Sequence, residues 1–176
     1  MPEQRYLTNV RDHDEFEMAV EGLKKWRTEE ECVAARFVVY AAAMGYLART
    51  ILAKHRDARW LELEWGCEPP SRLEACDVLD ENKQVVESCE DVDTDLWRVP
   101  SWLDEGEFLD QHAEHVGASA YLLDLRKAER CYVPPKISMA VDRKWKREAR
   151  RAAQVEAALT QAGIPEPPSC PAPNGA

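Results

Sequence analysis

The chain has 176 residues, 45% of them hydrophobic, so it can bury a core as one domain without disulfide or metal support. It carries 33 acidic against 23 basic side chains, which gives a net charge of −10. This charge disfavours a protein that coats nucleic acid or binds an anionic membrane, because both tasks require a basic surface.

We expect neither a secretory signal nor a membrane-spanning segment. The sequence has no apolar run behind a basic N-terminus, as a secretory signal requires. The longest uncharged apolar part, residues 37–48, is too short to span a bilayer. The six cysteines are irregularly spaced, which favours reduced thiols. We therefore expect a cytoplasmic protein, and the excess of arginine over lysine, 15 to 8, favours a bacterial or phage source.

Residues 1–57 are expected to form a pair of helices. Apolar side chains recur every three or four residues from Phe16 to Trp26, the period of a helix face, and Asp12 and Asp14 are candidate N-caps. Thr28 and Glu31 form the capping-box pattern that begins a second helix. In that helix, the spacing predicts a buried seam of Val33, Phe37, Tyr40, Met44, Leu47 and Ile51.

Residues 58–95 are expected to form a small antiparallel sheet. Trp60–Trp65 alternates strictly between apolar and polar side chains, which predicts a half-buried strand. Glu62 and Glu64 would share the face opposite the two leucines of this strand.

Two further strands are expected over residues 72–79 and 84–89, so the sheet should have three or four strands. The turn between them, residues 80–83, contains Asn82, which is suited to a left-handed conformation.

Helices are predicted again after the sheet. One begins near residue 104 and is closed by Gly117, and a second covers residues 118–131, with a strand over 121–125 as the alternative. The last helix is expected from about Asp142 to Gln161.

The predicted fold class is therefore α+β: an N-terminal helical pair, a small three- to four-stranded antiparallel sheet and C-terminal helices. We expect a single domain over 1–163, with 1–57 helical, 58–95 sheet and 96–163 helical. The proline-rich tail, 164–176, is expected to be disordered.

Charge is segregated along the chain. Residues 1–61 carry ten acids and ten bases, 62–114 carry seventeen acids and three bases, and 115–176 carry six acids and ten bases. Carboxylates next to tryptophans are typical of a protein interface, because charge steers association and tryptophan anchors it. We predict a partner-binding face formed by Asp80, Glu81, Glu87, Glu90, Asp91, Asp93, Asp95, Trp97 and Trp102.

The last helix is amphipathic. On a helical wheel its apolar residues lie within one sector around Trp145, and its basic residues occupy the opposite side. This side suits contact with nucleic acid or with an acidic protein surface, and it otherwise provides solubility. Its members are Arg143, Lys144, Lys146, Arg147, Arg150 and Arg151.

Motifs for metal binding are incomplete. His112 and His115 lie three residues apart on a predicted helix, but no cysteine pair with zinc-site spacing accompanies them. Asp91, Asp93 and Asp95 open like a calcium loop, but the positions that require glycine and glutamate are filled by leucine and tryptophan. We predict no cofactor and no metal, with His112 and His115 as the remaining ligand candidates.

The leading hypothesis is a non-enzymatic acidic protein that occludes a basic or nucleic-acid-handling protein partner. Immunity proteins, antitoxins and anti-CRISPR-like counter-defence inhibitors belong to this class. A metal-dependent hydrolase or nuclease is one alternative, and a nucleic-acid adaptor that uses the basic last helix is another.

Overall fold

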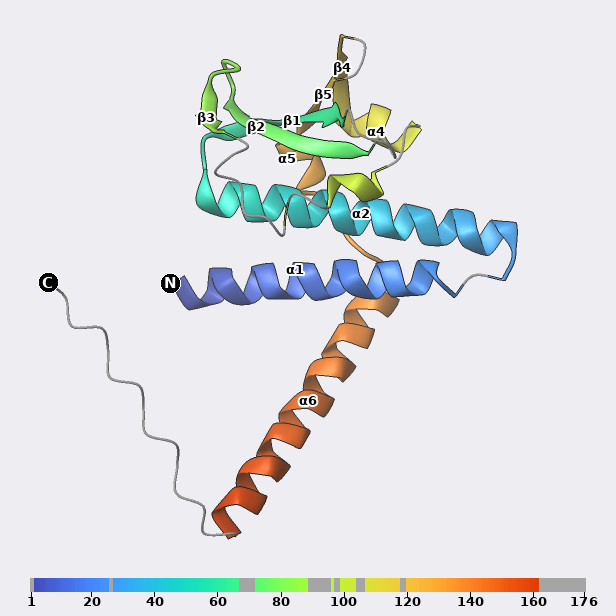
Figure 1. Ribbon diagram of the computed structural model, residues 1–176, viewed down its shortest axis with the longest axis vertical. Helices are drawn as coiled ribbons and strands as arrows, with labels where there is room; N and C mark the ends of the chain where they lie inside the picture. The colour runs from blue at the N-terminus through green and yellow to red at the C-terminus, as the bar shows by residue number, and fades with distance from the viewer. Residues whose placement is uncertain are drawn as a thin grey trace, which may run out of the picture. The chain divides into compact units, whose positions relative to one another are not determined.

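The computed structural model describes residues 2–25, 27–66, 72–88, 96, 99–103, 107–117 and 120–161. The chain divides into two compact units, Met1–Val141 and Asp142–Ala176. The first unit holds two long helices and a five-stranded antiparallel sheet, and a long helix runs from its end into the second unit, so the fold class is α+β (Figure 1).

Helix α1 spans Pro2–Leu23 and packs against helix α2, which spans Glu29–Lys54. The predicted apolar face is confirmed where it is described, because Phe16, Ala19 and Val20 are buried. The predicted N-caps Asp12 and Asp14 are wrong, since both lie inside α1. Trp26, at the end of the predicted face, lies outside the described residues.

The capping box predicted at the start of α2 is confirmed. The Thr28 hydroxyl accepts a hydrogen bond from the Glu31 amide, and the Glu31 side chain accepts one from the Thr28 amide. These reciprocal bonds satisfy amides that the first helical turn leaves without partners.

The seam predicted along α2 is buried only in its second half. Met44, Leu47 and Ile51 are buried in the core, whereas Val33 and Phe37 are 48% and 49% exposed. The length and composition of α2 alone would allow it to cross a bilayer, but in this fold its second half packs inside the core, between α1 and the sheet (Figure 1).

The sheet has the strand order β3-β2-β1-β5-β4. The first three strands are β1 (Ala58–Trp65), β2 (Leu73–Asp80) and β3 (Val85–Glu87). They confirm the predicted strand positions. In the β2–β3 turn, however, Lys83 and not Asn82 adopts the left-handed conformation, with φ 60°.

Two further strands, β4 (Ala113–Val116) and β5 (Ala120–Asp124), make the sheet larger than predicted. The helix expected up to Gly117 ends at His112 as α4 (Glu107–His112), and Gly117, with φ +80°, lies in the β4–β5 connection. The helix expected over 118–131 is wrong and its strand alternative is correct. Of the described residues in that range, only the single turn α5 (Leu125–Ala128) is helical, because β5 finds a partner on each side, β1 and β4.

A cluster of polar contacts joins α1, α2 and the segment after α5. Arg49 on α2 donates from Nε to Asp12 Oδ2 at 2.8 Å, and from Nη1 to the carbonyl oxygens of Glu129 and Cys131 at 3.0 and 2.9 Å. Burial raises the pKa of the Asp12 carboxyl, and the hydrogen bond and charge of Arg49 offset only part of that effect. Asp12 is therefore a buried partner of Arg49 and not a helix cap.

Helix α6 spans Pro135–Gln161, so it begins seven residues before the predicted start at Asp142. Proline is well tolerated at the first helical position, because the amide it lacks would have no partner there. In the first unit, Ser138 on α6 donates a hydrogen bond to Glu15 on α1 at 2.7 Å. The predicted disordered tail, 164–176, lies outside the described residues.

Candidate functional site

The two faces of the sheet differ in chemistry. Leu61 and Leu63 of β1 are fully buried on the face that meets the helices. Trp60, Glu62 and Glu64 alternate with them and therefore lie on the other face, which we call the outer face. Figure 1 shows α1 and α2 on one side of the sheet. The prediction that Glu62 and Glu64 share a face opposite the leucines is confirmed.

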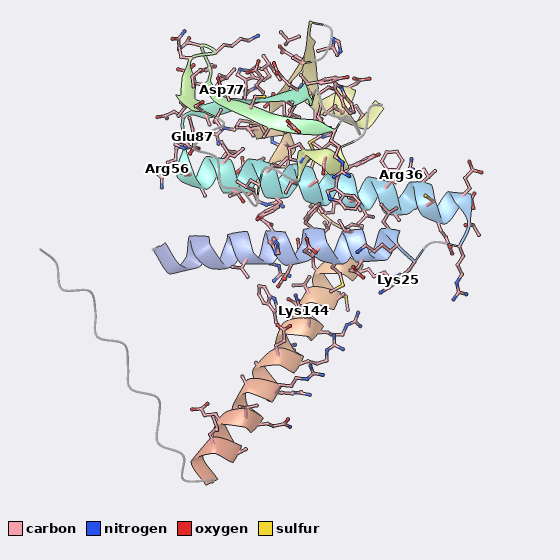
Figure 2. All side chains as sticks on the ribbon, in the orientation of Figure 1. Lys25, Arg36, Arg56, Asp77, Glu87 and Lys144 are labelled. Atoms are coloured by element: carbon pink, nitrogen blue, oxygen red, sulfur yellow. The ribbon has the colours of Figure 1, made fainter. Side chains whose placement is uncertain are left out.

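The outer face gathers carboxylates from three strands. Glu64 lies directly opposite Glu74 of β2, and Glu62 pairs with Leu122 of β5, which in turn pairs with Glu114 of β4. Figure 2 shows Asp77 of β2 on the side of the sheet away from α2. We call this group the acidic sheet face: Glu62, Glu64, Glu74, Asp77 and Glu114.

The carboxylates of this face repel one another. The pKa of Glu62 is raised by burial first, and then by the negative charges of Glu64 and Asp77. Glu64 and Glu74 add a like-charge cross-strand pair, which destabilises a sheet. Among the described residues, Glu62, Glu64 and Glu74 have no ion-pair or hydrogen-bond partner. The face thus holds negative charge that the described chain does not neutralise.

Cations lie at the Trp60 end of the acidic sheet face. Lys83 Nζ is 3.7 Å from Glu114 Oε2 and 5.7 Å from the centre of the Trp60 ring. The Arg59 guanidinium lies 5.3 Å from the same ring and pairs with Asp124 at 2.8 Å. The Trp60 indole nitrogen is buried and has no hydrogen-bond partner among the described residues.

The structure places three of the predicted acidic residues in different settings. Asp80 Oδ1 accepts hydrogen bonds from the amides of Asn82 and Gln84, both at 2.8 Å, and so shapes the β2–β3 turn. Glu81 is exposed in that turn. Glu87 faces α2 (Figure 2), where it contacts Lys54 Nζ and lies 2.8 Å from His55 Nε2. The Glu87 carboxylate is therefore paired within the protein.

The remaining predicted acids and one tryptophan lie outside the described residues: Glu90, Asp91, Asp93, Asp95 and Trp97. Trp102, the other tryptophan, is the last residue of the short 3-10 helix η2 (Pro100–Trp102) and is 38% exposed. It lines a cleft between η2, α2 and the ends of β1 and β2.

The two candidate metal ligands do not share a helix. His112 ends α4, and its Nε2 lies 3.3 Å from Cys131 Sγ, whereas His115 on β4 packs edge-on against Tyr121 at 4.7 Å. In the described parts of the chain, no group of three or more histidine, cysteine, aspartate or glutamate side chains is placed to hold a metal ion.

The contact between His112 and Cys131 resembles a nucleophilic pair only in composition. A reactive cysteine needs a lowered pKa, because the thiolate is the attacking species. Burial raises the pKa of the Cys131 thiol, and the nearby Arg49 charge offsets this only in part. The pair is therefore suited to packing and hydrogen bonding rather than to attack on a substrate.

The predicted basic residues of the last helix all lie on α6: Arg143, Lys144, Lys146, Arg147, Arg150 and Arg151. They belong to the second unit of the chain. Their position on a helix agrees with the prediction. The helix α6 is thus a second charged element, and its charge is opposite in sign to that of the acidic sheet face.

The predicted partner-binding face contained none of the five residues of the acidic sheet face, although Glu62 and Glu64 were expected to share one side of their strand. Glu114 lay in a predicted helix, and Glu74 meets Glu64 only through the register of β1 and β2. No protein-family model, curated protein or solved structure matches the chain. Its function must therefore be inferred from its own residues.

Proposed function

We propose that the chain is a non-enzymatic binding protein whose acidic sheet face docks on a basic surface of a protein partner. The observation that carries this proposal is the group of Glu62, Glu64 and Glu74, which have no counter-ion in the described chain. Cations of a partner would neutralise charges that otherwise repel one another, so docking relieves an electrostatic cost of the free protein.

The setting of these carboxylates supports a protein partner. They project from paired strands, which fix their spacing more firmly than a loop would. Trp60 lies beside them and carries a buried indole N–H without a described acceptor. Tryptophan next to complementary charge is a common centre of binding energy in protein interfaces.

A basic site that handles nucleic acid is the kind of partner surface this face would cover. Such a site displays lysine and arginine side chains that bind phosphate groups, and a cluster of carboxylates can form ion pairs with the same side chains. Occlusion of that site would be the mode of action of an immunity protein, an antitoxin or a counter-defence inhibitor.

The test is a matched pair of triple variants. The face variant is Glu62→Gln, Glu64→Gln and Glu74→Gln, and the control variant is Glu17→Gln, Glu29→Gln and Glu30→Gln, which makes the same charge change at exposed helical positions. Immobilised protein captures partners from cells of the source, and binding kinetics are then measured with the purified partner. The face variant should associate about tenfold more slowly or worse, with a weaker salt dependence, while the control matches the wild type.

Two outcomes would contradict the proposal. Equal loss of binding in both triple variants would show that only net charge matters. Full binding by the face variant, together with loss of nucleic-acid or partner binding after Arg147→Ala, Arg150→Ala and Arg151→Ala, would identify α6 as the working surface and the chain as an adaptor.

A further inference from the structure

A cleft of about 350 Å³ lies where the ends of β1 and β2 meet α2 and η2. Its volume falls in the range of small-molecule sites, which is about 300–1,000 Å³. Val39, Leu73 and Leu103 contribute buried apolar surface, and three aromatic residues also line the cleft: Tyr40, Trp65 and Trp102. The cleft can therefore enclose a flat or apolar body.

The cleft is cationic although the chain is acidic. Arg36 on α2, labelled in Figure 2, and Arg72, just before β2, both line it, and both side chains are exposed. Neither guanidinium has an ion pair with a described residue. None of the described lining residues carries a carboxylate. Two guanidinium groups are thus available at one site in a protein of net charge −10.

Trp65, one of the residues that line the cleft, also carries a hydrogen-bond donor. The Trp65 indole nitrogen is buried and has no hydrogen-bond partner among the described residues. A buried donor without an acceptor costs free energy, and an acceptor on a bound ligand would remove that cost. The two exposed arginines favour a negatively charged group in the cleft, and the Trp65 donor favours an oxygen acceptor next to it.

We propose that this cleft binds a small amphipathic anion, with an apolar or aromatic body and one carboxylate, sulfonate or phosphate group. The body packs against Tyr40, Trp65 and Trp102, and the anionic group meets Arg36 and Arg72. Guanidinium groups suit this role because they form paired, charge-assisted hydrogen bonds with such anions. This site is distinct from the acidic sheet face and involves none of its residues.

The test compares two fluorescent probes that differ mainly in charge. Anilinonaphthalene sulfonate carries the anionic group, and N-phenylnaphthylamine has a similar aromatic body without it. Wild-type protein should bind the anionic probe more tightly. The variant Arg36→Gln with Arg72→Gln should weaken binding of the anionic probe by roughly tenfold or more and leave the neutral probe within about twofold. Trp102→Ala should weaken binding of both probes.

The matched control is Arg130→Gln with Arg147→Gln, which removes the same charge from exposed positions that do not line the cleft. Circular dichroism checks that each variant is folded, and amide chemical-shift changes on the wild type locate the anionic probe without any substitution. Three results would overturn the proposal: equal affinity of the wild type for both probes, an equal effect of the control variant, or shift changes that lie away from the cleft.

Discussion

Arg49 holds together three segments that are distant in sequence, so its replacement tests the polar part of the core directly. In Arg49→Met the apolar stem of the side chain is retained while the guanidinium is lost. Asp12, whose side chain is 7% exposed, then keeps its charge without the Arg49 cation. The carbonyl oxygens of Glu129 and Cys131 lose the donor they share.

The size of the effect follows from burial. Removing one partner of a buried ion pair costs about 3–5 kcal/mol, because the other charge is left uncompensated. The Arg49 side chain is 24% exposed, so water reaches the site and the lower end applies. We expect a loss of about 3 kcal/mol in the free energy of unfolding, or roughly 6–12 °C in Tm for a chain of this size.

The loss of stability in Arg49→Met depends on pH through the Asp12 carboxyl. The pKa of Asp12 is already raised by burial, and loss of Arg49 removes influences that lower it, so this pKa rises further. Above that pKa the carboxylate is charged and the full cost is present. As the pH falls through it, the carboxyl takes up a proton in the folded state and the part of the cost that comes from its charge disappears. The difference between wild type and variant should therefore shrink from neutral toward acid pH.

Urea unfolding followed by circular dichroism, at neutral and at mildly acid pH, measures both effects. The double variant Asp12→Asn with Arg49→Met should recover part of the stability at neutral pH. Lys24→Met is the control, because its ion pair with Glu21 is exposed, and it should unfold at the wild-type urea concentration. A loss below about 1 kcal/mol for Arg49→Met, or a difference that does not change with pH, would refute this account of the buried pair.

Two further predictions concern single side chains. Glu62→Gln should raise Tm at neutral pH, because it removes a repelled carboxylate; since the folded-state pKa of Glu62 is raised, the gain should vanish as the pH falls through that pKa, and thermal melts at several pH values measure it. Thr28→Ala should cost about 1 kcal/mol in urea unfolding and speed amide exchange in the first turn of α2, whereas unchanged exchange would mean that the capping box does not protect that turn.

Local patterns predicted those elements whose partners are close in sequence. The capping box at Thr28 and the alternation in β1 depend on neighbouring residues, so both were visible in the sequence. The buried length of the α2 seam was overestimated. Periodicity shows which face of a helix is apolar, but it does not show how far along the helix other elements cover that face. Val33 and Phe37 follow the spacing, yet they remain half exposed.

Other features depend on contacts that no local pattern records. The apolar run that forms β5 fits a helix or a strand equally well, and pairing with β1 decides the outcome. The acidic sheet face and the cationic cleft also depend on contacts between residues that are distant in sequence. Glu64 meets Glu74 through strand register, and Arg36 lines the same cleft as Arg72 only because α2 ends up beside the end of β2.

The position of β1 at the centre of the sheet has a consequence for synthesis on the ribosome. One edge of β1 pairs with β2, which follows directly, but the other pairs with Ala120–Asp124, so it stays open until that segment is made. At about 5–20 residues per second, the nascent chain carries this unpaired edge for on the order of several seconds. Charged side chains on an open edge discourage pairing with another chain. Glu62 and Glu64 place two such charges on β1, so we expect its open edge to pair poorly with another chain until β5 has been made.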